Sequence, residues 1–376
     1  MSLISPGATI GILGGGQLGR MTAMAARSLG YHIHALDPDA SCASRFVVDK
    51  LHVAKFDDVG AARALAAEVS VATIEIENIA EESLRAVAQR VPLRPGVEML
   101  TVIQDRVQQK QWLAHHGFAV GPHRICANED ELGAAVDSLG AVFAKSARGG
   151  YDGRSQAQVG GRDQARAAWA ALGSCVAEKA LALDQEVSVL VARRPSGEIA
   201  VYPPAVNHHQ NRILAWSSLP GELSPRLTTR AGEIARAIAE KFSLEGLLVV
   251  ELFVVGGDLL VNELAPRPHN SFHSSEVACA TSQFEQLVRA ICDLPLGAVD
   301  IVRPAAIYNL LGDLWQSGDP PFARALEVPS VRLHLYGKRV ARPGRKMGHL
   351  SASGSTPQEA LARVLEAAKR LTVHTG

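Results

Sequence analysis

The chain has 376 residues, of which 38 are basic, 38 are acidic and 47% are hydrophobic. This length is enough for two or three domains with buried cores, and the balanced charge argues against a nucleic-acid-binding or membrane-surface protein. No apolar run reaches the roughly 18–20 residues of a membrane-spanning helix, and the first residues lack the basic start and cleavage site of a signal peptide. Five dispersed cysteines without a CxxC pair, and no histidine cluster at zinc spacing, favour a reduced cytoplasmic protein.

The N-terminal third alternates between strand and helix patterns. Short apolar runs predict strands over residues 8–13, 31–37 and 71–76, and apolar residues at helical spacing predict helices over 17–29 and 56–69. Alternation of this kind is typical of a parallel, doubly wound sheet. We therefore expect an α/β domain at the start of the chain.

The rest of the chain mixes helices and strands without an internal repeat. Helices are predicted over residues 105–116, 229–242 and 357–371, and strands over 186–191, 199–202, 246–255 and 258–263. Gly256 and Gly257 join the last two strands, and a two-residue glycine turn is a strong signal for a β-hairpin. This part of the chain is therefore expected to be α+β.

A glycine-rich loop follows the first predicted strand. Residues 14–19 match the pattern GxGxxG, and Asp37 ends the next strand. Glycines here let the backbone approach a phosphate, and the helix N-terminus stabilises an anion. Three interpretations stay open: a nicotinamide or flavin dinucleotide, another phosphorylated ligand, or a tight turn with a structural role.

A second glycine-dense stretch runs from Lys145, at the end of a predicted strand, to Gln156. Backbone N–H groups and a lysine in such a loop can offset the negative charge of a polyphosphate. An ordinary hairpin turn with a solvated lysine is the alternative. The stretch is therefore a candidate polyphosphate-binding loop.

Two acidic residues, Glu251 and Glu263, lie on the two strands of the predicted hairpin, where they can face one another on one side of the sheet. Two carboxylates held together among apolar residues repel unless a cation lies between them. Oxygen ligands of this kind favour Mg²⁺, which bridges to substrate phosphates. Solvated strand glutamates are the alternative, but flanking apolar residues such as Val250 and Leu252 favour a metal site.

Two polar segments lie further along the chain. Residues 266–273 combine Arg, His and Asn with two prolines, and we expect this rigid loop to position a substrate beside the metal site, although it could be a plain strand-to-helix connection. The basic stretch 336–349 contains Lys338, Arg345 and Lys346. It is either a phosphate-binding hairpin or a solvated charged edge.

Together these segments resemble the ATP-grasp superfamily and, within it, the N5-carboxyaminoimidazole ribonucleotide synthetase family. The matching residues, in chain order, are 14–21, 75–78, Asp105, Arg106, Gln109, Lys110, 149–153, Glu178, Glu186, Asn207, His209, 262–267, 269–271 and 342–349. The resemblance implies an ATP-grasp fold, α/β and α+β, with a doubly wound pre-ATP-grasp domain at 1–104. An ATP-grasp domain at 105–300, with a lid subdomain at about 122–183, and a small C-terminal domain at 301–376 would follow.

The resemblance also implies an activity. ATP, bicarbonate and 5-aminoimidazole ribonucleotide would give N5-carboxyaminoimidazole ribonucleotide, ADP and phosphate by way of carboxyphosphate, in IMP synthesis. ATP and Mg²⁺, with Mn²⁺ as an alternative ion, are the implied cofactors. A cytoplasmic homodimer without nucleic-acid or membrane partners is the implied form. On this interpretation the GxGxxG loop serves the ribonucleotide instead of a dinucleotide.

The resemblance assigns roles residue by residue. ATP would be bound by Arg106, Lys145, Gly150, Tyr151, Asp152, Gly153, Arg154, Ser155, Gln156, Glu178, Lys179, Ala180, Leu181, Glu186, His209, Asn262 and Glu263. The ribonucleotide would be bound by Gln17, Leu18, Glu75, Asn270, Lys338, Arg345 and Lys346. The metal would be held by Glu251 and Glu263, and the catalytic residues would be Tyr151, Asp152, Arg267 and Lys338.

Two other functions stay open. A formate-dependent glycinamide ribonucleotide transformylase, or another ATP-grasp ligase, would share the fold and the basic hairpin, but residues 149–153 and 262–267 favour the carboxylating enzyme. A catalytically silent nucleotide-binding or scaffolding protein is the other alternative. The presence of Lys145, Glu251 and Glu263 argues against it.

Overall fold

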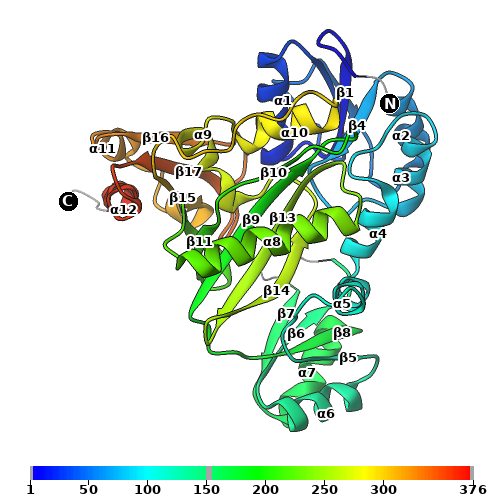
Figure 1. The fold of residues 1–376 in the computed structure, drawn as a ribbon, viewed down its shortest axis with the longest axis vertical. Coiled ribbons are helices and arrows are strands. Elements are labelled where there is room, and N and C mark those ends of the chain that lie inside the picture. Colours follow the sequence, from blue (N-terminus) through cyan, green and yellow to red (C-terminus); the bar gives the residue numbers. More distant parts are fainter. Residues whose placement is uncertain (1–2, 150–154, 373–376) are drawn as a thin grey trace.

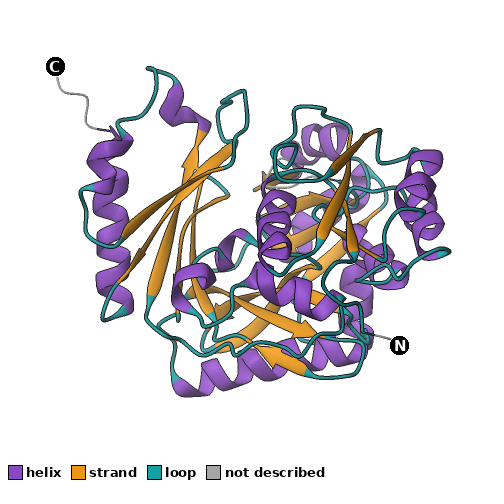
Figure 2. Cartoon of the chain, turned by 90° about the horizontal axis from the view of Figure 1, so that it is seen from above, coloured by secondary structure: helices purple, strands orange, loops and turns teal. Residues whose placement is uncertain are grey.

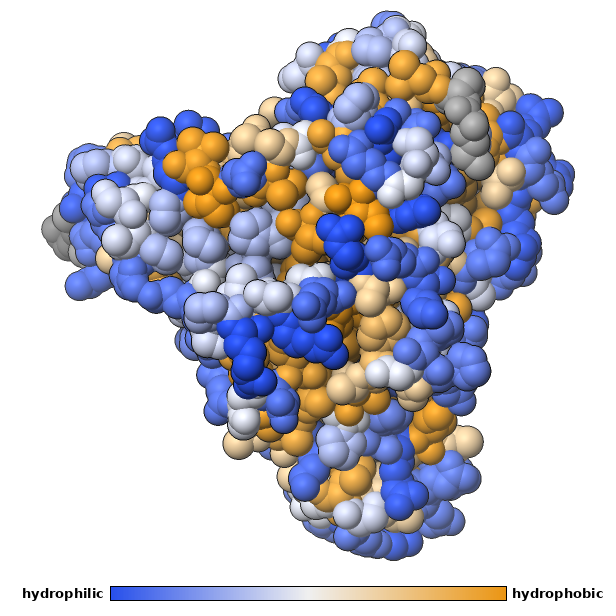
Figure 3. All heavy atoms as spheres, viewed as in Figure 1, coloured by the Kyte–Doolittle hydropathy of each residue, from blue (hydrophilic) through white to orange (hydrophobic). Residues whose placement is uncertain are grey.

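The computed structural model describes residues 3–149 and 155–372, whose strands form three sheets (Figure 1). Among the described helices, none combines the length and the apolar character that crossing a membrane requires. Hydrophilic residues cover most of the face drawn in Figure 3, with apolar residues in small groups between them. The expected mixture of α/β and α+β structure is confirmed.

The N-terminal sheet is parallel, with strand order β3-β2-β1-β4. Its strands are β1 (Thr9–Leu13), β2 (His32–Asp37), β3 (Lys50–Val53) and β4 (Val71–Ile74), and its helices are α1 (Gln17–Ser28), α2 (Val59–Ala66), α3 (Glu81–Ala88) and α4 (Val97–Gln104). The three strands and two helices predicted here are confirmed, but α2 begins later than expected because the Asp58 side chain caps it by accepting a hydrogen bond from the Ala61 amide. The edge strand β3 was not predicted, since none of its four residues is buried.

The largest sheet is antiparallel, in the order β14-β13-β9-β11-β12-β15-β17-β16, with β10 paired to β9. Its strands are β9 (Gln185–Arg193), β10 (Ile199–Val201), β11 (Ala205–Gln210), β12 (Ile213–Leu219), β13 (Gly246–Val255), β14 (Asp258–Ala265), β15 (Ala305–Leu311), β16 (Val331–Leu335) and β17 (Lys346–Ser353). The predicted hairpin is β13 with β14. Because β12 pairs with β15, the C-terminal strands continue the central sheet instead of forming one of their own.

A smaller antiparallel sheet, in the order β5-β8-β6-β7, lies within the stretch predicted as the lid subdomain. It consists of β5 (His123–Cys126), β6 (Val142–Ser146), β7 (Gln156–Val159) and β8 (Cys175–Lys179), with α6 (Glu129–Leu139) and α7 (Arg162–Leu172) packed on it. Cys126, Ala144 and Cys175 lie in its hydrophobic core, and all five cysteines of the chain are free thiols. The strands β6 and β7 hold the two ends of the second glycine-dense stretch.

The remaining helices pack on the large sheet or join it to the other sheets. They are α5 (Arg106–His115), α8 (Pro225–Lys241), α9 (Ser275–Ala278), α10 (Gln283–Ile291), α11 (Phe322–Leu326) and α12 (Pro357–Thr372), with the short 3₁₀ turns η1 (Asn270–Phe272) and η2 (Gly312–Trp315). Ala360, Val364 and Leu371 recur at helical spacing on α12 and are buried against β15 and β17 (Figure 2). Burying a Val or Leu side chain contributes about 1.5–3 kcal/mol, so this face fixes α12 on the sheet.

Candidate active site

The predicted acidic pair lies on the hairpin of the large sheet. Glu251 of β13 is directly opposite Glu263 of β14, while Leu252 is opposite Val261, so Asn262 is an extra residue in a β-bulge. A regular ladder would place Glu263 on the other face of the sheet, because side chains alternate between faces. The expected facing of the two glutamates is therefore confirmed, and the bulge is its cause.

The two carboxylates affect each other electrostatically. Burial, followed by the negative charge of Glu263, raises the pKa of Glu251 to about 7. Oxygen donors that repel each other in this way are suited to a divalent cation between them. The residues present therefore fit a magnesium site.

Glu251 has two further neighbours. Its Oε1 is 3.2 Å from His269 Nε2, and its Oε2 accepts a hydrogen bond from Asn262 Nδ2 at 3.4 Å. Burial holds the pKa of His269 well below its usual range, so the imidazole is neutral at pH 7. His269 belongs to the polar loop 266–273, which was expected to position a substrate, but His269 was not among the predicted site residues.

A polar pocket opens beside the acidic pair. It is lined by Arg106, Gln109, Lys110, Lys145, Glu178, Asn262 and Glu263. The Glu178 carboxylate lies 2.6 Å from Lys145 Nζ and 2.9 Å from Lys110 Nζ. Burial alone would raise the pKa of Glu178, but the two ammonium groups outweigh burial and lower it to about 2. Glu178 therefore stays charged and holds two cations side by side in the pocket.

Asn262, the bulged residue, ties this pair of cations to the hairpin. Lys145 Nζ donates a hydrogen bond to Asn262 Oδ1 at 3.1 Å, and Lys110 Nζ donates to the Asn262 carbonyl oxygen at 2.9 Å. Lys110 was not among the predicted ATP-binding residues. The sequence does contain an indication of Lys110, because this residue lies one helical turn after Arg106 on α5 and the two side chains share a helix face. The pocket thus places concentrated positive charge next to two carboxylates.

Arg106 connects the pocket to the lid subdomain. Its Nη2 lies 3.6 Å from Glu263 Oε1, and its Nη1 donates hydrogen bonds to the carbonyl oxygens of Ser146 and Gly149 at 2.9 Å each. Ser146 is the last residue of β6, and Gly149 follows it by three residues. Arg106 therefore fixes the start of the second glycine-dense stretch at the pocket.

The lid subdomain carries most of the other predicted ATP-binding residues. Those outside the described residues are Gly150, Tyr151, Asp152, Gly153 and Arg154. Those that are described are Ser155, Gln156, Lys179, Ala180 and Leu181. Gln156 is paired with Lys145 in the β6–β7 register. The amides of Lys179 and Ala180 donate hydrogen bonds to neighbouring backbone carbonyl groups at 2.9 and 2.8 Å, so these two N–H groups serve the fold of the lid.

Glu186 and His209 form an ion pair on neighbouring strands of the large sheet. Glu186 Oε2 is 2.7 Å from His209 Nδ1. Burial would lower the pKa of His209, but the adjacent Glu186 carboxylate outweighs burial and raises it. Glu251 and Lys346 also act electrostatically on this imidazole. The predicted Glu186–His209 site therefore belongs to the same polar region as the acidic pair.

Two carboxylates of the protein itself accept hydrogen bonds from the backbone amides of the GxGxxG loop. Glu75 accepts hydrogen bonds from the Gly16 amide at 2.7 Å and the Gly19 amide at 2.9 Å, and Asp37 accepts one from the Gly15 amide at 2.7 Å. Because these three donors are already used, the loop has lost much of its capacity to bind an anion. This arrangement argues against any phosphate or pyrophosphate held by these amides and favours a tight turn with a structural role.

The basic segment between β16 and β17 lies against the N-terminal domain. Leu18 and Met21 of α1 pack with Phe284 of α10 and with Tyr336, which begins the basic segment. This hydrophobic cluster joins the first helix of the chain to the C-terminal strands. Predicted ribonucleotide-binding residues from both ends of the sequence are thereby brought to one junction.

The basic residues at this junction are held by backbone groups. Lys338 Nζ donates a hydrogen bond to the Lys346 carbonyl oxygen at 2.7 Å, and Arg345 Nη1 donates to a carbonyl oxygen of the same segment at 2.9 Å. Lys346 is buried, and its charge acts on both His209 and His269. Lys346 is therefore part of the polar region, whereas Arg339 and Arg342 of the same segment are exposed.

Arg267 and Asn270 follow β14, and Arg267 reaches the N-terminal domain. Arg267 Nε is 2.8 Å from Glu77 Oε1. Asn270 is buried, and among the residues that the structure describes its Oδ1 has no hydrogen-bond partner. A buried acceptor without a partner is rare. This amide is therefore a candidate contact for a bound molecule.

The sheets and this site define an ATP-grasp protein, with a lid sheet and a large antiparallel sheet that contribute lysines and an acidic pair to one pocket. The sequence profile of the ATP-grasp domain matches residues 111–284, and that of the ribonucleotide synthetase preATP-grasp domain matches residues 7–104. The profile of the phosphoribosylaminoimidazole carboxylase C-terminal domain matches residues 305–363. The expected ATP-grasp fold with a domain on each side is confirmed, and the limits of the predicted domains stay a prediction.

Individual relatives identify the family. The chain is 40% identical to the N5-carboxyaminoimidazole ribonucleotide synthase of Bacillus subtilis over 357 residues, which cover 93% of this chain and 92% of that protein. Identity to the Brucella melitensis synthase is 40% over 360 residues, which cover 93% of this chain and 97% of that protein. The chain belongs to the N5-carboxyaminoimidazole ribonucleotide synthase family.

Solved structures agree with this assignment. An ADP complex of an N5-carboxyaminoimidazole ribonucleotide synthetase has a TM-score of 0.92 and 38% identity, with 97% of each chain covered. The Aspergillus clavatus N5-carboxyaminoimidazole synthase, in complex with ADP and 5-aminoimidazole ribonucleotide, has a TM-score of 0.88 and 29% identity, with 98% of this chain and 99% of that chain covered. The architecture is therefore shared over nearly the whole chain.

Proposed function

We propose that this chain is an ATP-dependent ligase that joins bicarbonate to 5-aminoimidazole ribonucleotide. The products are N5-carboxyaminoimidazole ribonucleotide, ADP and phosphate, and the reaction belongs to IMP synthesis. The observation that carries the proposal is the acidic pair Glu251 and Glu263 beside the pocket that contains Lys110 and Lys145. The names of the relatives and the ligands of the Aspergillus clavatus complex support the choice of substrates.

The pocket residues bind and orient the polyphosphate of ATP. Lys110, Lys145 and Arg106 supply positive charge, and Glu178 holds the two ammonium groups together. Phosphoryl transfer needs positioning and charge stabilisation more than it needs a covalent protein nucleophile. A rigid array of cations is therefore the main contribution that this chain makes to the first chemical step.

Glu251 and Glu263 would hold Mg²⁺, with Mn²⁺ as an alternative ion. The ion would supply positive charge that offsets the negative charge of the ATP phosphates. His269 and Asn262 hold Glu251 in place through its two carboxylate oxygens. Because the pKa of Glu251 is about 7 without a cation, a proton and the metal compete for this carboxylate near neutral pH.

In the first step a bicarbonate oxygen attacks the γ-phosphorus of ATP, the bond to the β–γ bridging oxygen breaks, and ADP leaves. In the second, the exocyclic amine of the ribonucleotide attacks the carboxyl carbon of carboxyphosphate, the bond from carbon to the phosphate oxygen breaks, and the departing phosphate takes up the proton that the amine loses. We assign Tyr151, Asp152, Arg267 and Lys338 to this second step. Arg267 is held by Glu77 and offers a fixed cation for the charge that develops there.

The ribonucleotide would lie at the junction of the N-terminal domain and the basic segment. Its phosphate would be bound by Lys338, Arg345 and Lys346, and the buried unpartnered acceptor of Asn270 would contact a donor on the ligand. Gln17, Leu18 and Glu75 complete the proposed ribonucleotide site. By its resemblance to the family, we also propose that the protein is a cytoplasmic homodimer.

A substrate-omission assay tests the proposal. ADP release is measured with ATP, Mg²⁺, bicarbonate and 5-aminoimidazole ribonucleotide, and then with each component left out. Rapid release should require both bicarbonate and the ribonucleotide. Release that does not depend on the ribonucleotide would identify another acceptor, and no release would contradict the assignment as a ligase. Turnover with formate and glycinamide ribonucleotide instead would favour the transformylase.

A further inference from the structure

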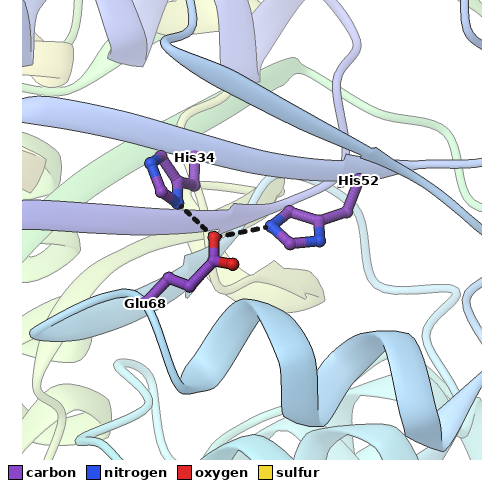
Figure 4. A group of neighbouring side chains, drawn as sticks. All are labelled: His34, His52 and Glu68. Carbon is purple, nitrogen blue, oxygen red and sulfur yellow. Dashed lines mark hydrogen bonds and ion pairs between the residues drawn. The ribbon is translucent and has the colours of Figure 1, made fainter.

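Two histidines and a glutamate meet at the edge of the N-terminal sheet (Figure 4). His34 of β2 and His52 of β3 lie on the same face of these paired parallel strands, and Glu68 lies just beyond α2. His34 Nδ1 is 3.1 Å from Glu68 Oε2, and His52 Nε2 is 3.2 Å from the same oxygen. The three ligand atoms all lie within 4.8 Å of one another. Both imidazoles therefore face one carboxylate oxygen.

His52 Nε2 is hydrogen-bonded to Glu68 Oε2 at 3.2 Å, and Lys50 Nζ lies 2.6 Å from the other oxygen of this carboxylate. The two nitrogen-to-oxygen distances, 3.1 and 3.2 Å, are also close to the spacing of ligands on a shared ion. A tetrahedral zinc ion with bonds of about 2.0–2.1 Å has ligand atoms about 3.3 Å apart. Within the described part of the chain, His34 Nδ1 is buried and has no hydrogen-bond partner.

The cluster is partly sheltered from solvent. The His34 and His52 side chains are 18% and 12% exposed, and the side chain of Glu68 is 34% exposed. An ion can therefore reach the three ligand atoms from solvent.

We propose that His34, His52 and Glu68 form a binding site for a borderline divalent transition-metal ion, represented by Zn²⁺. Two imidazole nitrogens with one carboxylate oxygen suit such ions, whereas Mg²⁺ prefers oxygen ligands alone. Three protein ligands leave one tetrahedral position for water. The ion ties β2, the edge strand β3 and the segment after α2 together. The ion thereby cross-links the N-terminal sheet. Its ligands belong neither to the ATP pocket nor to the acidic pair.

Lys50 is the residue that opposes a bound cation. Its ammonium group occupies the second oxygen of Glu68, but its side chain is 49% exposed and can move into solvent. Replacing Lys50 by methionine removes a like charge from the neighbourhood of the ion and frees that oxygen for a second bond. The Lys50→Met variant should therefore bind Zn²⁺ more tightly than the wild type.

The test uses the full chain after treatment with a chelator. Zn²⁺ is titrated by calorimetry and Co²⁺ by visible absorption, both in excess Mg²⁺ so that sites made only of oxygen ligands are filled. We expect one high-affinity Zn²⁺ per chain and a Co²⁺ spectrum typical of a low-coordinate nitrogen and oxygen site. His52→Gln and Glu68→Gln should each weaken binding about tenfold or more. The exposed His32 lies on the same strand, so His32→Gln is the matched control and should bind like the wild type.

Each outcome decides the matter. Equal Zn²⁺ affinity in the wild type, His52→Gln and Glu68→Gln would show that the ion binds elsewhere. If the wild type binds no Zn²⁺, the cluster is only a set of ion pairs. Either result overturns the proposal. Circular dichroism checks whether His52→Gln and Glu68→Gln fold. If one of them does not fold, the Lys50→Met variant still tests the site, because it keeps all three ligands. Unchanged or weaker binding in that variant contradicts the site.

Discussion

Replacing Glu178 by glutamine tests the cation pair of the proposed ATP pocket. The side chain of Glu178 is 11% exposed, and its carboxylate lies 2.6 Å from Lys145 Nζ and 2.9 Å from Lys110 Nζ. Folding lowers its pKa from 4.5 to about 2. Since one pKa unit corresponds to about 1.4 kcal/mol, the charged carboxylate contributes about 3 kcal/mol to stability at pH 7. Breaking a buried ion pair by removing one partner costs a similar amount, about 3–5 kcal/mol.

The pH dependence of this contribution has a definite sign. A carboxyl group whose pKa is lower in the folded state stabilises the fold at every pH above its unfolded pKa. The contribution of Glu178 is therefore complete above pH 4.5 and is lost as the pH falls toward about 2. Because glutamine does not titrate, the difference in unfolding free energy between wild type and Glu178→Gln should be constant near neutral pH and should shrink below pH 4.5.

Urea unfolding followed by tryptophan fluorescence measures this difference, because Trp169 lies on α7 of the lid and Trp112 on α5. At pH 7 we expect Glu178→Gln to be about 3 kcal/mol less stable than the wild type. Glu129→Gln makes the same chemical change at an exposed position on α6 of the lid, and should alter stability by less than about 0.5 kcal/mol. Equal stability of the two variants, or a difference that grows on acidification, would refute the reasoning.

Three further substitutions test other parts of the molecule. Glu263→Gln should lower turnover roughly 100-fold, because one charge of the acidic pair disappears; turnover near that of the wild type at saturating Mg²⁺ would remove Glu263 from the metal site. Lys338→Ala should raise the KM for the ribonucleotide about tenfold, the effect of one lost hydrogen bond between charged groups, and an unchanged KM would take Lys338 out of the phosphate site. Gly14→Ala should destabilise the protein by about 1–3 kcal/mol, because Gly14 has a φ of 107° and an added Cβ would lie 2.4 Å from Glu75 Cγ. Gly7 has a φ of 92° and open space around it, so Gly7→Ala measures backbone strain alone; equal losses in thermal unfolding would show that contact with Glu75 is not what requires glycine at position 14.

The acidic pair could be predicted because a hairpin brings together residues that are close in the sequence. Gly256 and Gly257 mark the turn, and the apolar pattern on each side marks the strands. The sequence did not reveal the bulge at Asn262, without which Glu251 would face Asn262 instead of Glu263. The facing of the glutamates was thus predicted correctly, but the local backbone that produces it became visible only in the structure.

Contacts between distant segments could not be predicted in the same way. Zinc motifs in sequences are recognised by ligands a few residues apart, and the cluster of His34, His52 and Glu68 draws its ligands from three separate elements. The carboxylate that closes the GxGxxG loop comes from Glu75, 59 residues after Gly16 in the chain. Both arrangements depend on which strands are neighbours in the parallel sheet, and local patterns do not specify that order.

The C-terminal segment shows why domain limits drawn on a sequence say little about which residues build a site. Pairing of β12 with β15 makes one sheet of the strands that carry Glu186, Glu251 and Lys346. Lys346 is consequently close enough to act on His209 and His269, which belong to the central part of the chain. Hydrogen bonds between strands therefore set the separation of the acidic pair from the basic segment. Transfer between two bound substrates requires positioning to within about 1 Å, and a continuous sheet provides it where two loosely joined domains would not.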